Sequence, residues 1–259
     1  MTIPGVVLRK PERSRNPGDR DGKRPSSRCG AVPRNPPAQS LDGSGDILDL
    51  RFRALIPDRD WASLSPAVRR RFGKRLPQGA SAVYVGHIVG MQVSRLGWLV
   101  AQATRLVGSP LPLERGTGRA GVVTVTEDPD GGGQIWTRLY ARASGFPQVI
   151  HSAKRFAGPT GLEEHVGAGV GMTLTVTVAD GALVFRSHRY FVDCLRRRLH
   201  LPDWLTPGAF TVTHADAGAD ATAGAFRFIL DIEHPWFGRL IRQEAIFQDA
   251  EPAAQDGAT

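Results

Sequence analysis

Residues 169–190 read GVGMTLTVTVADGALVFRSHRY, and this stretch carries the clearest fold signal in the chain. Apolar side chains alternate with threonines up to Asp180-Gly181, and a second alternating run follows. Alternation with a period of two is typical of a half-buried β-strand, and Asp-Gly is a preferred two-residue turn between antiparallel strands. The stretch therefore predicts a β-hairpin with strands at 169–179 and 182–190.

Similar runs occur on both sides of this hairpin. We expect further strands at residues 82–93, 122–127, 134–142, 148–156, 210–214, 225–233 and 239–247. Helical spacing of apolar residues predicts helices at 61–74 and 96–107. Because the connections between strands are short, antiparallel pairing is favoured. The predicted fold class is α+β, mainly antiparallel β: a curved sheet or partly closed barrel of about eight strands with two helices near its N-terminal side.

The composition divides the 259-residue chain into three parts. Residues 1–45 are rich in Pro, Arg and Gly and lack apolar periodicity, so they are predicted to form a disordered basic tail. Residues 46–250 are expected to form a single domain, and residues 251–259 a disordered C-terminus. No internal repeat suggests a further division.

The formal net charge of +8 is unevenly distributed. Residues 1–40 hold nine Lys or Arg and three acidic residues, a local charge of +6, which leaves only +2 for the remainder. A nearly neutral domain argues against an extended track for phosphates, so specific binding of nucleic acid is not expected. No apolar run approaches the roughly 20 residues that span a bilayer, so no membrane span is expected either.

The sequence also limits cofactors and location. Cys29 and Cys194 lie far apart and form neither a disulfide framework nor a CxxC metal motif, which favours a reducing, cytoplasmic location. P-loop, HExxH and GxSxG motifs do not occur. The GxGxxG string at 116–121 follows a proline-rich loop and precedes a predicted strand, which is the wrong context for a dinucleotide site. We therefore predict neither a cofactor nor a metal.

Aromatic and cationic residues alternate along two predicted strands. Trp136, Arg138, Tyr140 and Arg142 share one face of the first. Arg186, His188 and Tyr190 align on the second. Such a face can stack on a flat ligand or bind a carboxylate, and would form an anion-accepting pocket if both strands lined one concavity. The alternative is an exposed face on which Arg stems cover the aromatic rings.

Several short segments, taken in order, resemble the DUF4166 family of bacterial domains over residues 55–248. They are YVGHIVGMQVSR (84–95) with the following Leu/Trp helix, PLP (110–112), WTR (136–138), LEE (162–164), the segment 202–207, and HPWFG (234–238). Members of this family occur alone or behind a Rossmann-type domain similar to saccharopine dehydrogenase or short-chain reductases. The resemblance implies a ligand-handling or accessory module and assigns no catalytic residue. Arg95, Trp136, Arg138 and Glu164 fall inside the family-like segments.

These observations lead to three functional hypotheses. The first is a module whose curved sheet encloses an apolar pocket for a lipid-like or aromatic anion. Its candidate ligand-binding residues are Arg95, Trp136, Arg138, Tyr140, His151, Glu164, Arg186 and His188. The second is an enzyme that transfers protons through Glu164 with His151 or His188, although Glu163-Glu164-His165 is more typical of a solvated turn. The third is an interaction domain for a separate Rossmann oxidoreductase.

Overall fold

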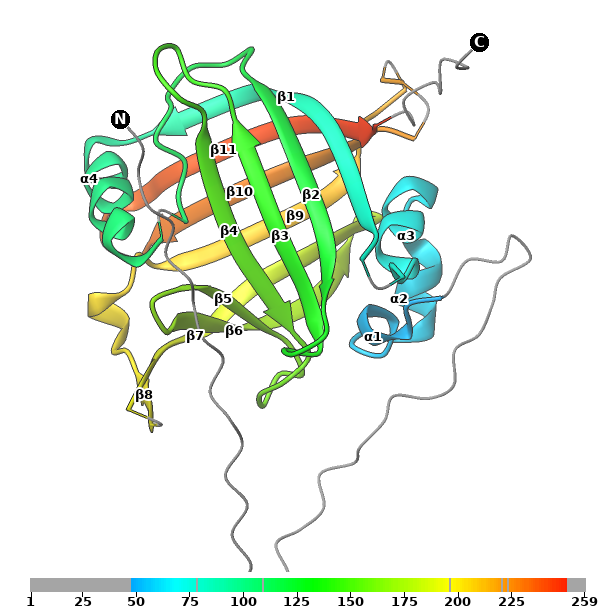
Figure 1. The fold of residues 1–259 in the computed structure, drawn as a ribbon, viewed down its shortest axis with the longest axis horizontal. Helices are drawn as coiled ribbons and strands as arrows, with labels where there is room; N and C mark the ends of the chain where they lie inside the picture. Colours follow the sequence, from blue (N-terminus) through cyan, green and yellow to red (C-terminus); the bar gives the residue numbers. More distant parts are fainter. Residues whose placement is uncertain are drawn as a thin grey trace, which may run out of the picture. The chain divides into compact units, whose positions relative to one another are not determined.

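A computed structural model describes residues 48–77, 79–108, 110–195, 197–219, 221–222 and 224–250. Within these residues the chain forms a closed antiparallel β-barrel with short helices at both ends (Figure 1). The predicted tail at 1–45 and the predicted C-terminal segment at 251–259 lie outside the described residues.

Ten of the eleven strands in the described part of the chain form the barrel. They are β1 (Ser81–Val93), β2 (Ala120–Asp128), β3 (Gly133–Tyr140), β4 (Gln148–Arg155), β5 (Glu163–Gly167), β6 (Val170–Ala179), β7 (Ala182–Cys194), β9 (Ala209–Asp216), β10 (Phe226–His234) and β11 (Gly238–Asp249). Each pairs with the next along the chain, and β1 pairs with β11 to close the ring. The short β8 (Arg197–His200) pairs with the end of β7 alone.

The expected antiparallel β architecture is therefore present, but the expected strand count and the partial closure are wrong. Two strands were missed, β5 and β8, because both are short and rich in charged residues. Closure was missed because the pairing of β1 with β11 joins segments about 160 residues apart, such as Gly86 and Phe247, and no local pattern encodes it.

The helices lie at opposite ends of the barrel (Figure 1). The α3 end carries α1 (Leu50–Arg53), α2 (Asp58–Ser63) and α3 (Pro66–Gly73). The α4 end carries α4 (Arg95–Ala103), followed by the 3-10 helices η1 (Thr104–Val107) and η2 (Asp203–Leu205). The helix predicted at 61–74 is interrupted because Ser65 caps α3, its Oγ accepting from the Val68 N–H at 3.4 Å. Among the described residues, no helix has the length and apolar character needed to cross a bilayer.

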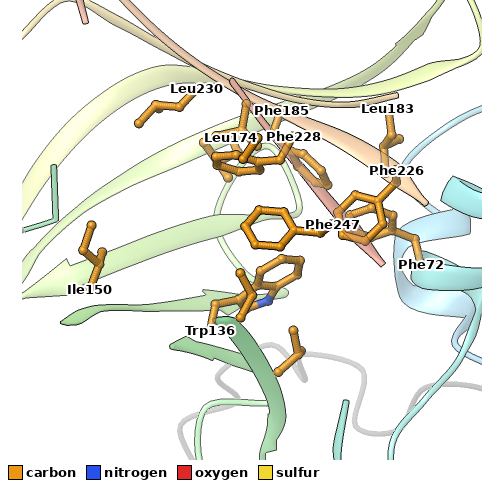
Figure 2. Packing of buried hydrophobic residues seen from close by; sticks show 14 of the residues in the cluster. Phe72, Trp136, Ile150, Leu174, Leu183, Phe185, Phe226, Phe228, Leu230 and Phe247 are labelled. Carbon is orange, nitrogen blue, oxygen red and sulfur yellow. The ribbon is translucent and has the colours of Figure 1, made fainter. Parts of the chain in front are cut away.

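Aromatic rings pack inside the barrel toward the α3 end. Phe72 from α3 meets Trp136 from β3 and Phe185 from β7, with ring centroids 6.2 and 5.5 Å away. Figure 2 shows these rings beside Phe226 and Phe247, which come from the facing wall. These rings fill their part of the barrel interior, and a separate cavity lies nearer the α4 end.

Candidate ligand-binding site

The alternating residues of β3 point into the barrel. Trp136, Arg138 and Tyr140 are all buried, whereas Ile135 and Leu139 at the alternate positions are exposed. The predicted common face is therefore present, and its interpretation as an exposed surface is wrong. Arg142, which continues the spacing, lies beyond the end of the strand and is exposed.

Neighbouring strands place more polar groups beside Arg138. Cross-strand pairing sets Lys154 of β4 directly opposite Glu164 of β5. The Lys154 Nζ donates to the Glu164 carboxylate at 2.8 Å, and the Arg138 guanidinium lies 3.7 Å from the other carboxylate oxygen. Arg138 also donates to the Ser152 Oγ at 3.1 Å. These four side chains form a buried polar cluster on the inner wall.

The polar cluster holds two cations and one carboxylate. Burial acts to raise the pKa of Glu164, but Lys154 and Arg138 outweigh it, so the net direction of that pKa is down. Burial lowers the pKa of Lys154, and the ion pair with Glu164 opposes that change. With Glu164 ionised and both partners protonated, the cluster carries one positive charge in excess, which favours an anion nearby.

A cavity of about 390 Å³ adjoins the polar cluster and extends toward the α4 end. Arg138, Ser152 and Glu164 line it at the cluster, and the rest of the wall is mostly apolar. The apolar lining includes Val100, Val107, Leu111, Ile150, Met172, Leu201, Leu205, Phe210, Val212, Phe228, Leu230 and Ile232. An apolar cavity with a few polar groups at one side is the usual form of a small-molecule site.

Two buried polar atoms at the cavity have no hydrogen-bond partner among the described residues. They are the Tyr140 hydroxyl and the Gln243 Nε2, both on side chains that line the cavity. Burial raises the pKa of Tyr140, so its hydroxyl stays protonated and can donate. Tyr190, by contrast, donates to the Gly208 carbonyl at 2.9 Å and fixes the loop beside the cavity. Unpaired buried donors are uncommon and point to a missing acceptor.

The cavity thus brings together Arg138, Tyr140 and Glu164 of the predicted site residues, with Trp136 adjacent. Four others lie elsewhere: Arg95 is exposed at the start of α4, and His151, Arg186 and His188 are exposed on the outer surface of the barrel. His151 faces outward from β4, where its Nδ1 lies 3.0 Å from the Thr137 hydroxyl.

The expected alignment of Arg186, His188 and Tyr190 fails because of a β-bulge in β7. The pairing register shifts between Arg189 and Ser187, which leaves His188 as the extra residue. The bulge changes the phase of the alternation, so Tyr190 points inward while Arg186 and His188 remain outside. Since Glu164 lies inside, the barrel wall separates it from His151 and His188, and this geometry does not support the Glu/His proton-transfer pair.

The interpretation of Glu163-Glu164-His165 as a solvated turn is also wrong. These residues form β5, and both glutamates are buried. Glu164 faces the interior cluster, whereas Glu163 is paired with Arg198 of β8 and with His165. The cations that stabilise the two carboxylates lie 10 and 35 residues away, so a local pattern could not reveal them.

Gln243 and Ser152 also line the cavity and were not predicted, whereas Tyr190 lies there as one member of the predicted second face. Gln243 breaks the alternating apolar face of β11 between Ile241 and Ala245, both of which are fully buried. A polar residue at an expected core position was the available signal for it. Ser152 occupies the equivalent inward position between Ile150 and Lys154 on β4.

A second hollow, of about 810 Å³, lies at the α3 end. Its wall includes Arg71, whose guanidinium carbon lies 3.9 Å from the centre of the Tyr84 ring and 4.1 Å from that of Phe226. The Arg71 Nε and Nη1 have no hydrogen-bond partner in the described part of the chain. Burial lowers the pKa of Arg71 to about 10, so it stays charged at neutral pH and adds to the positive interior.

Comparison with known proteins gives one match. The family described as "Domain of unknown function (DUF4166)" matches residues 64–247, more than half of the chain. This range includes every barrel strand, apart from the last two residues of β11. No significant similarity to a curated protein or to a solved structure was found.

Proposed function

Because the chain belongs to the DUF4166 family, whose description assigns no activity, its function must be argued from its site, and we propose that the barrel binds an amphipathic small molecule. The apolar part of this molecule, an acyl chain or an aromatic ring system, occupies the 390 Å³ cavity. Its acidic head lies at the polar cluster beside Arg138.

One observation carries this proposal: the polar side of the cavity offers hydrogen-bond donors that lack acceptors. The Tyr140 hydroxyl and the Gln243 Nε2 are buried and unpartnered within the described residues. Each such atom costs about 1–3 kcal/mol when left unsatisfied. A carboxylate or a similar acidic group would accept from both and would also offset the excess positive charge of Arg138 and Lys154.

The size and form of the cavity support the same class of ligand. Its volume lies within the range of roughly 300–1,000 Å³ that is usual for small-molecule sites. Closed barrels of more than about eight strands commonly leave an interior wide enough for a ligand. The ten-stranded ring of this chain encloses such a cavity.

The proposal predicts that Arg138 discriminates between charged and neutral ligands. The probes are dodecanoic acid and dodecanol, which share a chain and differ in charge, with affinity measured by isothermal calorimetry. We expect Arg138→Gln to weaken dodecanoic acid binding about ten- to hundredfold, since a hydrogen bond to a charged group contributes about 1.5–3 kcal/mol. Binding of dodecanol should change little.

The matched control is Arg186→Gln, which removes an exposed arginine from the outside of β7. It should leave both affinities unchanged. Native mass spectrometry of gently purified protein should also show a co-purified acidic species. Absence of such a species, together with no thermal shift from amphipathic acids, would contradict the proposal.

A further inference from the structure

Large apolar side chains are exposed mainly at the α4 end of the barrel. Six of them are more than three-fifths exposed: Leu106, Phe146, Leu195, Trp204, Trp236 and Phe237. They lie on four separate connections, which follow β1, β3, β7 and β10. We call these six residues the rim. A concentration of apolar surface this marked on one side of a protein is typical of an interaction site.

The α3 end differs in this respect. Its described large hydrophobic residues with exposed side chains, Val83 and Ile135, are only 36% and 38% exposed and lie singly on the outer faces of β1 and β3. The remaining exposed ones lie singly on the strands or beside the rim, on α4 and in the 199–205 segment. The α3 end is also basic, because α1 to α3 contain several arginines. Positive charge alone therefore does not distinguish the α4 end; the combination of charge with apolar side chains does.

Cations surround the rim. Exposed arginines lie on the same connections, among them Arg95, Arg105, Arg115, Arg142 and Arg197. Arg115 stacks over the Trp98 ring, with its guanidinium carbon 5.5 Å from the ring centre. Glu114 and Asp203 are the acidic residues described on these connections, so positive charge is in clear excess. Aromatic side chains that are flanked by cations favour the interface of an anionic bilayer.

The cavity reaches the surface between the same connections. Val107 of η1, Leu205 of η2 and Pro207 line its outer part, and Leu106 and Trp204 of the rim are their immediate neighbours in sequence. Any surface that binds the rim therefore also lies against the opening of the cavity.

From these observations we propose that the rim docks on the surface of an anionic membrane, with the cavity mouth turned toward the lipid. This inference rests on the proposed function and adds the source of the ligand, because an amphipathic acid could then pass between bilayer and cavity without crossing bulk water. A protein partner fits less well, since one that covered the rim would also cover the mouth.

The test uses the full chain and flotation with two kinds of vesicle, phosphatidylcholine alone and phosphatidylcholine mixed with phosphatidylglycerol. We expect preferential binding to the mixed vesicles. The double variant Trp236→Ser with Phe237→Ser should weaken this binding about tenfold or more, because two aromatic side chains no longer enter the interface. Brominated lipid should quench tryptophan fluorescence in the wild type and quench it less in the variant.

The matched control is Val83→Ser with Ile135→Ser, which removes two exposed apolar side chains near the α3 ends of β1 and β3. It should bind vesicles as the wild type does. All three proteins keep residues 1–45, so attraction of that basic segment to anionic lipid is the same in each. Equal binding by the wild type and the rim variant would overturn the inference.

Binding of dodecanoic acid in solution separates the two proposals. Normal affinity for the acid without vesicle binding would overturn membrane docking and leave the proposed function standing. Vesicle binding without affinity for the acid would contradict the proposed function and with it the transfer of ligand. Concentration-dependent self-association that is lost in the rim variant, without vesicle binding, would identify the rim as a protein contact and overturn the inference.

Discussion

At the scale of single residues, Tyr140 illustrates a conflict between stability and binding. Its hydroxyl is buried without a described partner, and the ring otherwise packs in the barrel wall. We expect Tyr140→Phe to raise the free energy of unfolding by up to about 1 kcal/mol, because it removes an unsatisfied polar group without creating a cavity. Urea denaturation of the ligand-free protein measures this change.

The same substitution should reduce affinity for dodecanoic acid about five- to tenfold, since one donor to the carboxylate is lost. Opposite signs in the two measurements are the distinguishing result. A loss of stability instead would show that the hydroxyl is already satisfied in the free protein, and would remove Tyr140 from the site.

At the scale of elements, the placement of α4 depends on Gly97. This buried glycine lets the helix approach β11 closely: a Cβ at this position would lie 2.1 Å from the Leu240 carbonyl oxygen. Ser94 fixes the start of the helix by accepting from the Gly97 N–H at 2.9 Å. The helix therefore cannot accept a side chain here without moving away from the strand.

We expect Gly97→Ala to destabilise the protein by about 1–3 kcal/mol through this overpacking and to alter ligand binding, since Val100 and Ala103 of α4 line the cavity. Thermal unfolding and calorimetry measure the two effects. The control is Gly73→Ala at the end of α3, where the nearest atom would lie 3.6 Å away, at an ordinary contact distance. Because alanine has the higher helix propensity, the control should keep or gain stability. No loss of stability in Gly97→Ala would show that contact with β11 does not restrict this position.

Which side chains share one face of a strand was predicted correctly where the alternation is uninterrupted. Trp136, Arg138 and Tyr140 were recognised as one face because β3 contains no irregularity. β7 looked equally regular, but the bulge at His188 changes the phase of the alternation, so Tyr190 points inward while Arg186 points outward. A bulge depends on the pairing register with the neighbouring strand, so it cannot be predicted from the sequence of one strand alone.

The interior site could be predicted only in part for a related reason. Arg138 and Glu164 were named as candidates, but the sequence did not show that they lie together or that Lys154 joins them. Their proximity follows from the pairing of β3 with β4 and of β4 with β5. The apolar cavity was even less accessible, because it depends on how ten strands and α4 leave space unfilled.

At the scale of the whole molecule, His214 links stability to pH. It is buried among Phe72, Phe185 and Phe228, and burial holds its pKa well below the ordinary value of 6.5. The positive charges of Arg71, Lys154 and Arg138 act in the same direction. The folded protein therefore keeps this imidazole neutral, whereas the unfolded chain takes up a proton below pH 6.5.

Stability should consequently fall as pH decreases below about 6.5, by at most about 1.4 kcal/mol per pH unit for this one group. Urea denaturation at pH ~7 and ~5.5 measures the slope, and His214→Leu should flatten it. Burial also lowers the pKa of His165, so His165→Gln serves as the comparison. This variant should keep the pH dependence of stability that is due to His214. An unchanged slope in His214→Leu would contradict the assignment.

The even number of strands in the ring has a practical consequence. The first strand begins and the last one finishes beside α3, with the amide of Ala250 donating to the Val83 carbonyl at 2.9 Å. The first and last residues described, Leu48 and Ala250, therefore both lie at the α3 end, away from α4 (Figure 1). A tether or fused reporter joined at either point would hold the molecule with its α4 end directed away from the attachment.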